Sequence, residues 1–269
     1  MGSGSTFNWF DQGGQSYAAF RPHYPDQLSA YLASLSAVHR VAIDVGCGTG
    51  QLTFSLARYF DHVLGLDPSA EQIQQANRAY QTTTRAEPYQ ADPKGEFQQK
   101  ITFIRSPAEA IPCADGIANL ITAAQAAHWF DLPRFYAEAR RVAGRDAILA
   151  LISYGVPALE PALDEPFSSF YWNELQAFWP PERKLVDQGY QTLDFPFTEI
   201  RSPKMAIECQ WDLPAFLGYL STWSAVKNLH AQGHSVILTR FAEGIGSRWG
   251  EPSKQRLIQW PLSMRVGRL

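Results

Sequence analysis

The sequence has few cysteines, no excess of positive charge and no long apolar run. Its three cysteines, Cys47, Cys113 and Cys209, are far apart and odd in number, which excludes a disulfide framework and a Cys-x-x-Cys zinc site. The formal net charge is −3 and 18% of the 269 residues are charged, so nucleic acid is not expected as the main partner. No apolar run approaches the roughly 20 residues that a membrane-spanning helix needs, so no membrane partner is expected.

Signals for export and for metal binding are also missing. Residues 1–5 lack the basic region and apolar core of a signal peptide, so we expect a cytoplasmic protein. The six histidines show no metal-ligand spacing, because His230 and His234 form an i, i+4 pair without a third ligand. We therefore expect no metal cofactor. The sequence does not indicate an oligomeric state.

What the sequence does contain is a glycine-rich turn between a predicted strand and a predicted helix. Residues 41–43 are apolar, residues 44–50 read Asp-Val-Gly-Cys-Gly-Thr-Gly, and residues 52–60 carry apolar side chains at helical spacing. Such a turn lets the backbone pass within contact distance of a nucleotide-like ligand. The dinucleotide fingerprint Gly-x-Gly-x-x-Gly needs a small residue where this sequence has Gln51, so the spacing disfavours a nicotinamide or flavin site.

The region around this turn alternates between strand-like and helix-like segments. Strands are predicted at 41–45, 62–66, 101–105, 117–122 and 147–152, helices at 52–60, from 69 onward and at 131–142, and a surface loop or frayed helix end at 81–100. Strands separated by helices imply parallel, right-handed crossovers. The predicted fold class is α/β, with a doubly wound, mostly parallel, seven-stranded Rossmann-like sheet. Ligands of such sheets bind at the carboxyl ends of the strands, so the segments that follow the strands should form one site.

The composition changes after residue 154, where prolines and aromatic side chains become frequent. We interpret this part as an aromatic-rich helical cap inserted after strand five, with one helix over about 213–226, and the alternating tail 257–269 as a last strand. The predicted organisation is an N-terminal helical arm covering the cofactor site (1–40), a Rossmann-like core (41–154), a cap or substrate region with a sheet strand (155–250) and a C-terminal strand completing the sheet (251–269).

Several polar residues follow the predicted strands. Asp67 lies 19 residues after Gly48, where an acid can accept hydrogen bonds from ribose hydroxyls or simply stabilise a helix N-terminus. Residues 106–109 read Ser-Pro-Ala-Glu, and form either an adenine-contacting loop or an ordinary helical turn. His128 is the only neutral-pH proton acceptor that the sequence places after strand four, or else a histidine packed beside Trp129.

A second group of candidates precedes the sheet. Tyr17, Arg21 and Tyr24 are spaced i, i+4, i+7, which is one helical face if the helix extends that far, although Pro22 and Pro25 predict that it ends near Arg21. Arg21 could pair with a carboxylate of a cofactor or substrate in bidentate fashion. The alternative is a surface pair on an amphipathic arm.

Taken together, these motifs resemble the class I S-adenosylmethionine (SAM) methyltransferases, in particular those of the trans-aconitate methyltransferase type. The resemblance covers nearly the whole chain and rests on Tyr17…Arg21-Pro-x-Tyr-Pro25, Asp44-x-Gly-x-Gly-x-Gly50, Asp67-Pro-Ser69, Pro107-Ala-Glu109, Ala127-His-Trp-Phe-Asp131 and Trp223-Ser-Ala225. The sequence departs from the pattern at Pro107, where many class I enzymes have an Asp that contacts the adenine amino group.

The resemblance implies SAM as the cofactor and S-adenosylhomocysteine as its product, but it does not identify the acceptor. Arg21 and the aromatic cap lead us to expect a small-molecule substrate, with O-methylation of a carboxylate or hydroxyl preferred. The expected cofactor contacts are Tyr17, Arg21, Asp44, Gly46, Gly48, Gly50, Asp67, Pro68, Ser106, Ala108, Glu109 and Ala123. The candidate catalytic residue is His128, and the candidate substrate contacts are Tyr24, Trp129, Trp172 and Trp223. Methyl transfer is an in-line displacement that depends largely on alignment, and a carboxylate acceptor needs no base.

Two other functions stay open at this point. One is a nicotinamide-dependent oxidoreductase, against which Gln51 and the lack of a clear Tyr-x-x-x-Lys pair both count. The other is a non-catalytic SAM-binding or interaction module whose aromatic segments form a partner surface.

Overall fold

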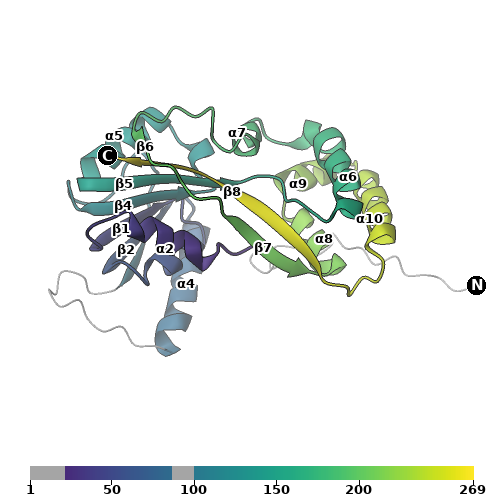
Figure 1. The fold of residues 1–269 in the computed structure, drawn as a ribbon, viewed down its shortest axis with the longest axis horizontal. Coiled ribbons are helices and arrows are strands. Elements are labelled where there is room, and N and C mark those ends of the chain that lie inside the picture. The colour runs from purple at the N-terminus through teal and green to yellow at the C-terminus, as the bar shows by residue number, and fades with distance from the viewer. Residues whose placement is uncertain (1–21, 87–99) are drawn as a thin grey trace, which may run out of the picture. The chain divides into compact units, whose positions relative to one another are not determined.

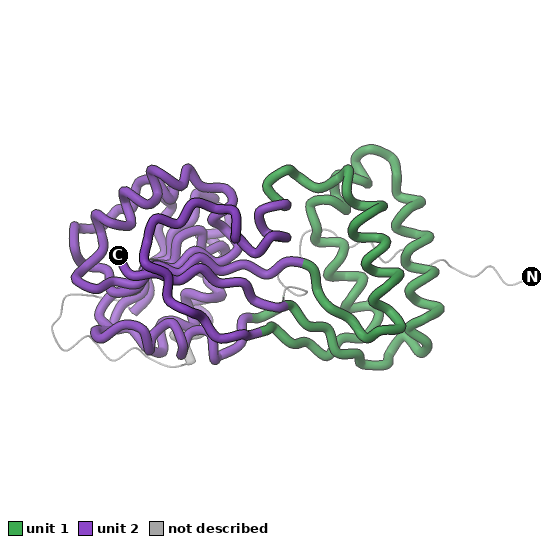
Figure 2. The backbone as a smooth tube through the Cα atoms, turned by 45° about the horizontal axis from the view of Figure 1, so that its top comes forward, with its two compact units in different colours: residues 1–23, 156–183, 206–260 green, residues 24–155, 184–205, 261–269 purple. Residues whose placement is uncertain are grey.

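The computed structural model describes residues 22–86 and 100–269 (Figure 1). These residues form two compact units, shown in green and purple in Figure 2. Unit 1 consists of residues 22–23, 156–183 and 206–260, and unit 2 of residues 24–86, 100–155, 184–205 and 261–269. The chain therefore leaves unit 2 after residue 155, returns to it for residues 184–205, and ends in it.

Unit 2 is built on a twisted sheet in which five strands run parallel in the order β3-β2-β1-β4-β5. The strands are β1 (Val41–Val45), β2 (His62–Asp67), β3 (Ile101–Arg105), β4 (Ala118–Ala124) and β5 (Ala143–Tyr154). The direction of winding reverses at β1, which has β2 on one side and β4 on the other. This arrangement confirms the predicted doubly wound, mostly parallel α/β fold, and puts its topological switch point between β1 and β4, where such folds bind ligands.

Within residues 22–86 and 100–269 the sheet has eight strands, so the predicted number of seven was wrong. The last strand, β8 (Arg256–Arg268), runs antiparallel to β5 and to β6 (Thr198–Glu199), and β7 (Ala206–Trp211) also pairs with β8. Two-residue strands are too short to show an alternating apolar pattern, and both residues of β6 are exposed. This strand therefore left no signal in the sequence.

Unit 2 contains the helices α2 (Asp26–Ser34), α3 (Gln51–Leu56), α4 (Ala70–Ala86) and α5 (Leu132–Val142). Two of them, α4 and α5, begin at a capping side chain, whereas α2 and α3 begin after Pro25 and Gly50 without one. Ser69 Oγ accepts a hydrogen bond from the Gln72 amide at 3.3 Å, and Asp131 Oδ1 accepts one from the Arg134 amide at 3.3 Å. The helix α4 extends through residue 86, so the first six residues of the predicted loop or frayed end at 81–100 are helical, and residues 87–99 lie outside the described residues.

The two faces of this sheet are covered by different helices, which lie on opposite sides of it in Figure 1. On one face, the buried side of α5 packs with the odd-numbered residues of β1, and this cluster contains Val41, Ile43, Val45, Phe135, Tyr136, Ala139 and Val142. On the other face, Ala76 of α4 packs with Ile101 and Phe103 of β3. Because β1 is buried on both faces, its sequence is apolar apart from Asp44.

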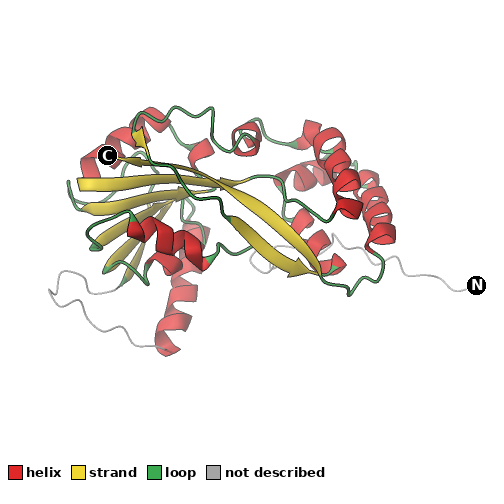
Figure 3. Cartoon of the chain, viewed as in Figure 1, coloured by secondary structure: helices red, strands yellow, loops and turns green. Residues whose placement is uncertain are grey.

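Unit 1 consists mainly of helices, drawn in red in Figure 3. They are α6 (Pro161–Ser169), η2 (Phe170–Glu174), η3 (Gln176–Phe178), α8 (Leu213–Ser221), α9 (Ser224–Ala231) and α10 (Val236–Trp249). The short helix α7 (Arg183–Asp187) has its first residue in unit 1 and its other residues in unit 2. The single helix predicted over about 213–226 is in fact two. Hydroxyls of Ser221 and Thr222 donate to the carbonyls of Gly218 and Tyr219 at 2.6 and 2.7 Å, which ends α8 before the extended residue Trp223.

No helix within residues 22–86 and 100–269 is both long and apolar enough to cross a membrane.

Candidate cofactor and active site

The glycine turn after β1 has three left-handed residues with different surroundings. The φ angles of Gly46, Gly48 and Gly50 are +71°, +55° and +88°, a region that disfavours side chains. A Cβ atom at Gly46 would lie 2.4 Å from Ala126 Cβ, and one at Gly50 would lie 2.7 Å from the Phe103 ring. At Gly48 the nearest described atom would be Gln72 Oε1 at 3.7 Å. Gly46 and Gly50 thus let the turn pack against the protein, whereas the side of Gly48 is open to a ligand.

Asp67 connects this turn to the end of β2. Its Oδ2 accepts a hydrogen bond from the Gly48 amide at 2.9 Å, and its Oδ1 accepts one from the Ser69 amide at 2.8 Å. The side chain is only partly buried, and each carboxylate oxygen can accept more than one hydrogen bond. Asp67 therefore fixes the turn and the start of α4 while keeping acceptor capacity for the hydroxyls of a ligand. The neighbouring Pro68 is exposed, and its carbonyl accepts from Arg105 Nε at 3.0 Å.

Asp44 is buried beneath the same turn. Its Oδ2 accepts from the Thr53 hydroxyl at 2.7 Å and its Oδ1 from the Thr122 hydroxyl at 2.8 Å, so it links β1 to α3 and β4. Burial raises the pKa of this carboxyl to about 6, although both threonine hydroxyls act in the opposite direction. Both oxygens of Asp44 are thus engaged within the protein.

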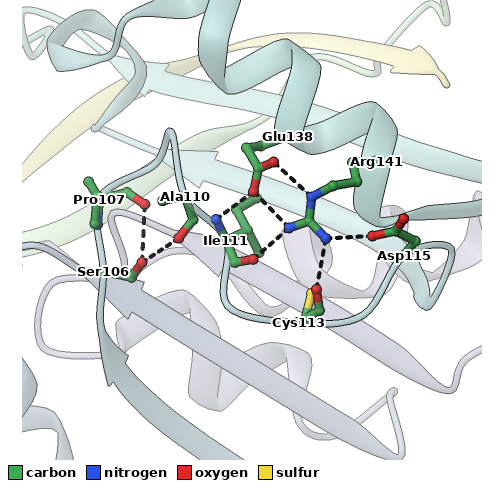
Figure 4. Close-up of polar contacts among 8 residues, drawn as sticks. All are labelled: Ser106, Pro107, Ala110, Ile111, Cys113, Asp115, Glu138 and Arg141. Atoms are coloured by element: carbon green, nitrogen blue, oxygen red, sulfur yellow. Dashed lines mark hydrogen bonds and ion pairs between the residues drawn. The ribbon is translucent and has the colours of Figure 1, made fainter.

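The loop after β3 lies beside Asp67. The Ser106 amide donates to the Asp67 carbonyl at 3.1 Å, and the Ser106 hydroxyl donates to the Ala110 carbonyl at 2.6 Å, which closes the turn (Figure 4). Ala108 is buried, and Pro107 is exposed. Glu109 Oε1 accepts from the Asp131 amide at 2.8 Å, so this carboxylate joins the loop to the N-terminus of α5.

An arginine clamp, defined here as Arg141 with Glu138 and Asp115, holds the other end of this loop (Figure 4). The Arg141 guanidinium donates to Glu138, to Asp115 and to the carbonyls of Ile111 and Cys113, each at 2.7–2.9 Å. Glu138 Oε2 also accepts from the Ile111 amide at 2.8 Å. These contacts attach residues 106–115 to α5 with charge-assisted hydrogen bonds, which are among the stronger ones in proteins.

The segment after β4 contains the candidate catalytic histidine. Ala123 is fully buried, and residues 127–129 form a short 3₁₀ turn, η1 (Ala127–Trp129). His128 is partly buried, and its Nδ1 lies 2.7 Å from Tyr190 Oη. Trp129 is 61% exposed, with its ring centroid 4.8 Å from that of His128. An exposed tryptophan beside a histidine is a surface that a ligand can cover.

The other predicted substrate contacts lie in different surroundings. Tyr24 is partly buried in unit 2, where its amide donates to Gln51 Oε1 at 3.3 Å and its ring meets that of Tyr154 at 6.0 Å. Trp223, which is 7% exposed, packs among aromatic rings of unit 1, namely Phe167, Tyr171, Trp179 and Tyr219. Trp172, also in unit 1, is 47% exposed. Tyr17 and Arg21 lie outside the described residues.

The structure thus brings together most of the predicted cofactor contacts of unit 2. Hydrogen bonds connect the Gly48 amide to Asp67 and the Ser106 amide to the same residue, and Glu109 is linked to the loop after β4. Our sequence reasoning missed Thr53, Thr122, Arg141 and Tyr190. Of these, Thr122 had a signal, because it is the last residue of the strand predicted at 117–122, and in the structure it pairs with Asp44 in the parallel register.

Among residues 22–86 and 100–269 there is no cluster of three or more His, Cys, Asp or Glu side chains that could hold a metal ion.

Comparisons with known proteins agree on one family. A family profile described as "Methyltransferase domain" matches residues 43–151. A Dictyostelium discoideum protein whose name describes it as a methyltransferase is 31% identical over 233 residues, which cover 85% of this chain and 81% of that protein. A Saccharomyces cerevisiae protein named as an S-adenosylmethionine-dependent methyltransferase is 28% identical over 143 residues, 52% of this chain and 45% of that protein.

A solved structure extends this similarity to the whole fold. It comes from Anaeromyxobacter dehalogenans, and its description refers to a type II methyltransferase. The two chains are 37% identical, with a TM-score of 0.80 over 93% of this chain and 98% of that one. The likeness therefore includes the parts of the chain that lie beyond the matched family domain.

Proposed function

The chain belongs to the class I SAM-dependent methyltransferases, and we propose that it transfers the methyl group to an oxygen atom of a small-molecule acceptor, a carboxylate in preference to a hydroxyl. The cofactor part of the proposal depends on the open side of Gly48 next to the Asp67 carboxylate. The acceptor part depends on the surroundings of His128.

The described residues fit the cofactor. We assign ribose binding to Asp67, close backbone approach to Gly48 and contact with the adenine edge to the loop of Ala108 and Glu109. Asp44 contributes indirectly: both of its carboxylate oxygens are bonded to threonine hydroxyls, so it fixes the turn and does not contact the cofactor itself. When bound, SAM supplies an electrophilic methyl group on a sulfonium centre.

Proline at position 107 changes how adenine would be held. It has no carboxylate for the adenine amino group and no amide hydrogen, so that loop can contribute only its backbone carbonyls, the amides of Ala108 and Glu109, and the Glu109 carboxylate. The Glu109 oxygen that is bonded to the Asp131 amide holds this loop against α5. We infer that the arginine clamp keeps the loop preorganised for adenine.

For the acceptor, we assign His128 and Trp129 to its binding, together with Tyr24. A carboxylate is already ionised at neutral pH, so its oxygen can attack without a base, and a histidine need only hold it in line. Trp129 offers an apolar surface that an acceptor would cover, since more than half of its side chain is exposed. Of the two tryptophans of unit 1, Trp172 is exposed, whereas Trp223 is part of the core of that unit.

Ligand binding tests the cofactor assignment. We expect S-adenosylhomocysteine to raise the free energy of unfolding by about 2.7 kcal/mol at a hundredfold excess over its dissociation constant, with no effect from NAD or NADP. Stabilisation by NAD instead of S-adenosylhomocysteine would contradict the assignment.

Turnover tests the acceptor assignment. The enzyme with SAM should convert members of a panel of small mono-, di- and tricarboxylic acids into methyl esters, detected by mass spectrometry and removed by mild alkali. Alkali-stable methyl products from amines, thiols or carbon acids, with none from carboxylates or hydroxyls, would contradict it.

A further inference from the structure

Tyr190 contacts His128 from a segment that is distant in the sequence. The distance from Tyr190 Oη to His128 Nδ1 is 2.7 Å across 62 positions, and the two ring centroids are 5.9 Å apart. Tyr190 is fully buried in unit 2, so this hydroxyl is shielded from bulk water. A buried phenol at this distance is a strong local constraint on the imidazole ring.

The backbone around Tyr190 adopts an unfavourable conformation. Gly189 and Tyr190 have φ angles of +60° and +61°, and the second is a left-handed conformation that bulky residues rarely adopt. A Cβ at Gly189 would lie 2.5 Å from Ser263 Oγ of β8, so the turn packs closely on that strand. Filling the core with an aromatic ring does not require such a backbone, and strained residues of this kind cluster at functional sites.

Arg265 of β8 holds this turn in place. Its Nη1 donates to the carbonyls of Leu193 at 2.7 Å and Tyr190 at 3.3 Å, and its side chain is only 15% exposed. The Tyr190 amide donates to the Leu185 carbonyl at 2.9 Å, and its carbonyl also accepts from the Leu193 amide at 3.2 Å. The position of the Tyr190 side chain is therefore fixed from both sides of the residue.

The chemistry of the pair decides which atom carries the proton. A phenol O–H is a good donor and a poor acceptor, whereas an unprotonated imidazole nitrogen is a good acceptor. We propose that Tyr190 donates its hydroxyl hydrogen to His128 Nδ1 and is the positioning residue that keeps the ring proton on Nε2. His128 then acts toward the acceptor carboxylate as a hydrogen-bond donor and not as a base, an assignment that rests on the function proposed above.

The tautomer can be measured without cofactor or acceptor. We would record long-range ¹H–¹⁵N spectra of the full chain labelled in histidine at about pH 8, where ordinary histidines are neutral, since the model-peptide pKa is about 6.5. The His128 signals are identified by their loss in His128→Gln. We expect a single Nε2–H tautomer in the wild type. A dominant Nδ1–H tautomer would overturn the proposal.

Two substitutions separate positioning from packing. Tyr190→Phe keeps the ring and removes the hydroxyl, so it should shift His128 toward a mixture of tautomers. Tyr136→Phe is the matched control, because Tyr136 is another buried tyrosine of unit 2 whose hydroxyl donates to the Asp194 carbonyl at 2.6 Å. This control should leave the His128 signals unchanged. An unaltered tautomer in folded Tyr190→Phe would overturn the proposal.

Kinetics with a carboxylate acceptor then test the consequence. Tyr190→Phe should raise the acceptor KM by about tenfold, the effect of one hydrogen bond, with a smaller change in kcat. In a His128→Ala background the same substitution should have no further effect, because Tyr190 acts through His128. Additive effects would overturn the coupling. If no methylation occurs at all, the proposed function fails, but the tautomer result still stands by itself.

Discussion

The Asp67 carboxylate and the Gly48 amide, 19 residues apart, are joined by a hydrogen bond of 2.9 Å that ties the end of β2 to the turn after β1. The same carboxylate accepts the Ser69 amide at the start of α4. One side chain thus fixes the relative positions of a glycine turn and a helix start, the two backbone features that we assign to the cofactor.

Replacing Asp67 with Ala should weaken S-adenosylhomocysteine binding by about ten- to hundredfold, because hydrogen bonds to a charged group contribute about 1.5–3 kcal/mol. Calorimetry on the folded variant measures the change. Asp212→Ala is the matched control, since Asp212 caps α8 by accepting from the Ala215 amide at 2.9 Å. The control should lose stability but keep cofactor affinity. Equal affinities in Asp67→Ala and wild type would show that Asp67 is only a helix-end acid.

The same substitution should have different effects at Gly48 and at Gly46. Gly48→Ala places a methyl group on the open side of the turn, so S-adenosylhomocysteine affinity should fall by about tenfold or more, or about 1.4 kcal/mol. Gly46→Ala instead forces a collision with Ala126 and should destabilise the fold by about 1–3 kcal/mol more than Gly48→Ala does. Denaturant unfolding and calorimetry on both variants check this. Wild-type affinity in Gly48→Ala would mean that no ligand approaches there.

The arginine clamp should matter for both stability and binding. Arg141→Ala removes one donor from the Ile111 carbonyl, which keeps the Cys113 amide, and one from the Cys113 carbonyl, so the free energy of unfolding should fall by about 1–3 kcal/mol in total. Because the clamp holds residues 106–115, cofactor affinity should fall as well. Arg145→Ala is the control, since Arg145 is 97% exposed. Unchanged denaturant midpoints in Arg141→Ala would contradict the clamp.

Asp44 should give stability an unusual dependence on pH. Its pKa is about 6 in the folded protein against 3.8 for the free side chain, so the folded state holds an extra proton between these values. The contribution of Asp44 to the free energy of unfolding should therefore fall as pH rises from about 4 to about 6 and then level off, by about 3 kcal/mol in total.

Comparison with Asp44→Asn isolates this contribution, because the amide does not titrate. The difference in unfolding free energy between wild type and variant should therefore fall between about pH 4 and about pH 6 and then stay constant. For Asp26→Asn, the difference in unfolding free energy from wild type should change with pH in the opposite direction. The Arg58 guanidinium lowers the pKa of the exposed Asp26 carboxyl, so the stabilisation from Asp26 is lost as pH falls. A flat difference for Asp44→Asn would contradict the raised pKa.

The parallel core was predictable because its signals are local. Apolar runs marked β1 and β2, Ser69 and Asp131 marked helix starts, and parallel topology alone gathers strand ends at one edge. The glycine pattern also carried information, although only the structure distinguishes Gly48, where the described residues leave room for a Cβ, from Gly46 and Gly50, where they do not.

The parts that were missed depend on contacts that are distant in the sequence. Tyr190 reaches His128 across 62 positions from a left-handed turn, and no periodic pattern marks such a residue. The same is true of Arg141, whose partners include two backbone carbonyls that no sequence pattern identifies. The helix expected over about 213–226 was wrong because two hydroxyls compete for backbone carbonyls at its middle.

His128 provides the test that separates positioning of the acceptor from base catalysis. If His128 donates from Nε2 to a carboxylate, His128→Ala should raise the acceptor KM by about ten- to hundredfold, the range for a hydrogen bond to a charged group. His128→Gln should recover part of this loss, since the glutamine amide keeps an N–H donor. Neither variant should change SAM affinity much, and the wild-type rate should show no titration near neutral pH.

A base would behave differently in each of these measurements. Glutamine cannot accept a proton at neutral pH, so both variants would lose about 10²–10⁴ in kcat, and the wild-type rate would rise with the deprotonation of a histidine. Steady-state kinetics across pH for wild type, His128→Ala and His128→Gln therefore give distinct patterns for the two roles. An ionised carboxylate needs no proton removed, and we propose that Tyr190 donates to Nδ1. We therefore expect His128→Gln to have a lower acceptor KM than His128→Ala. Equal losses in both variants, with kcat most affected, would establish a base and exclude the donor role.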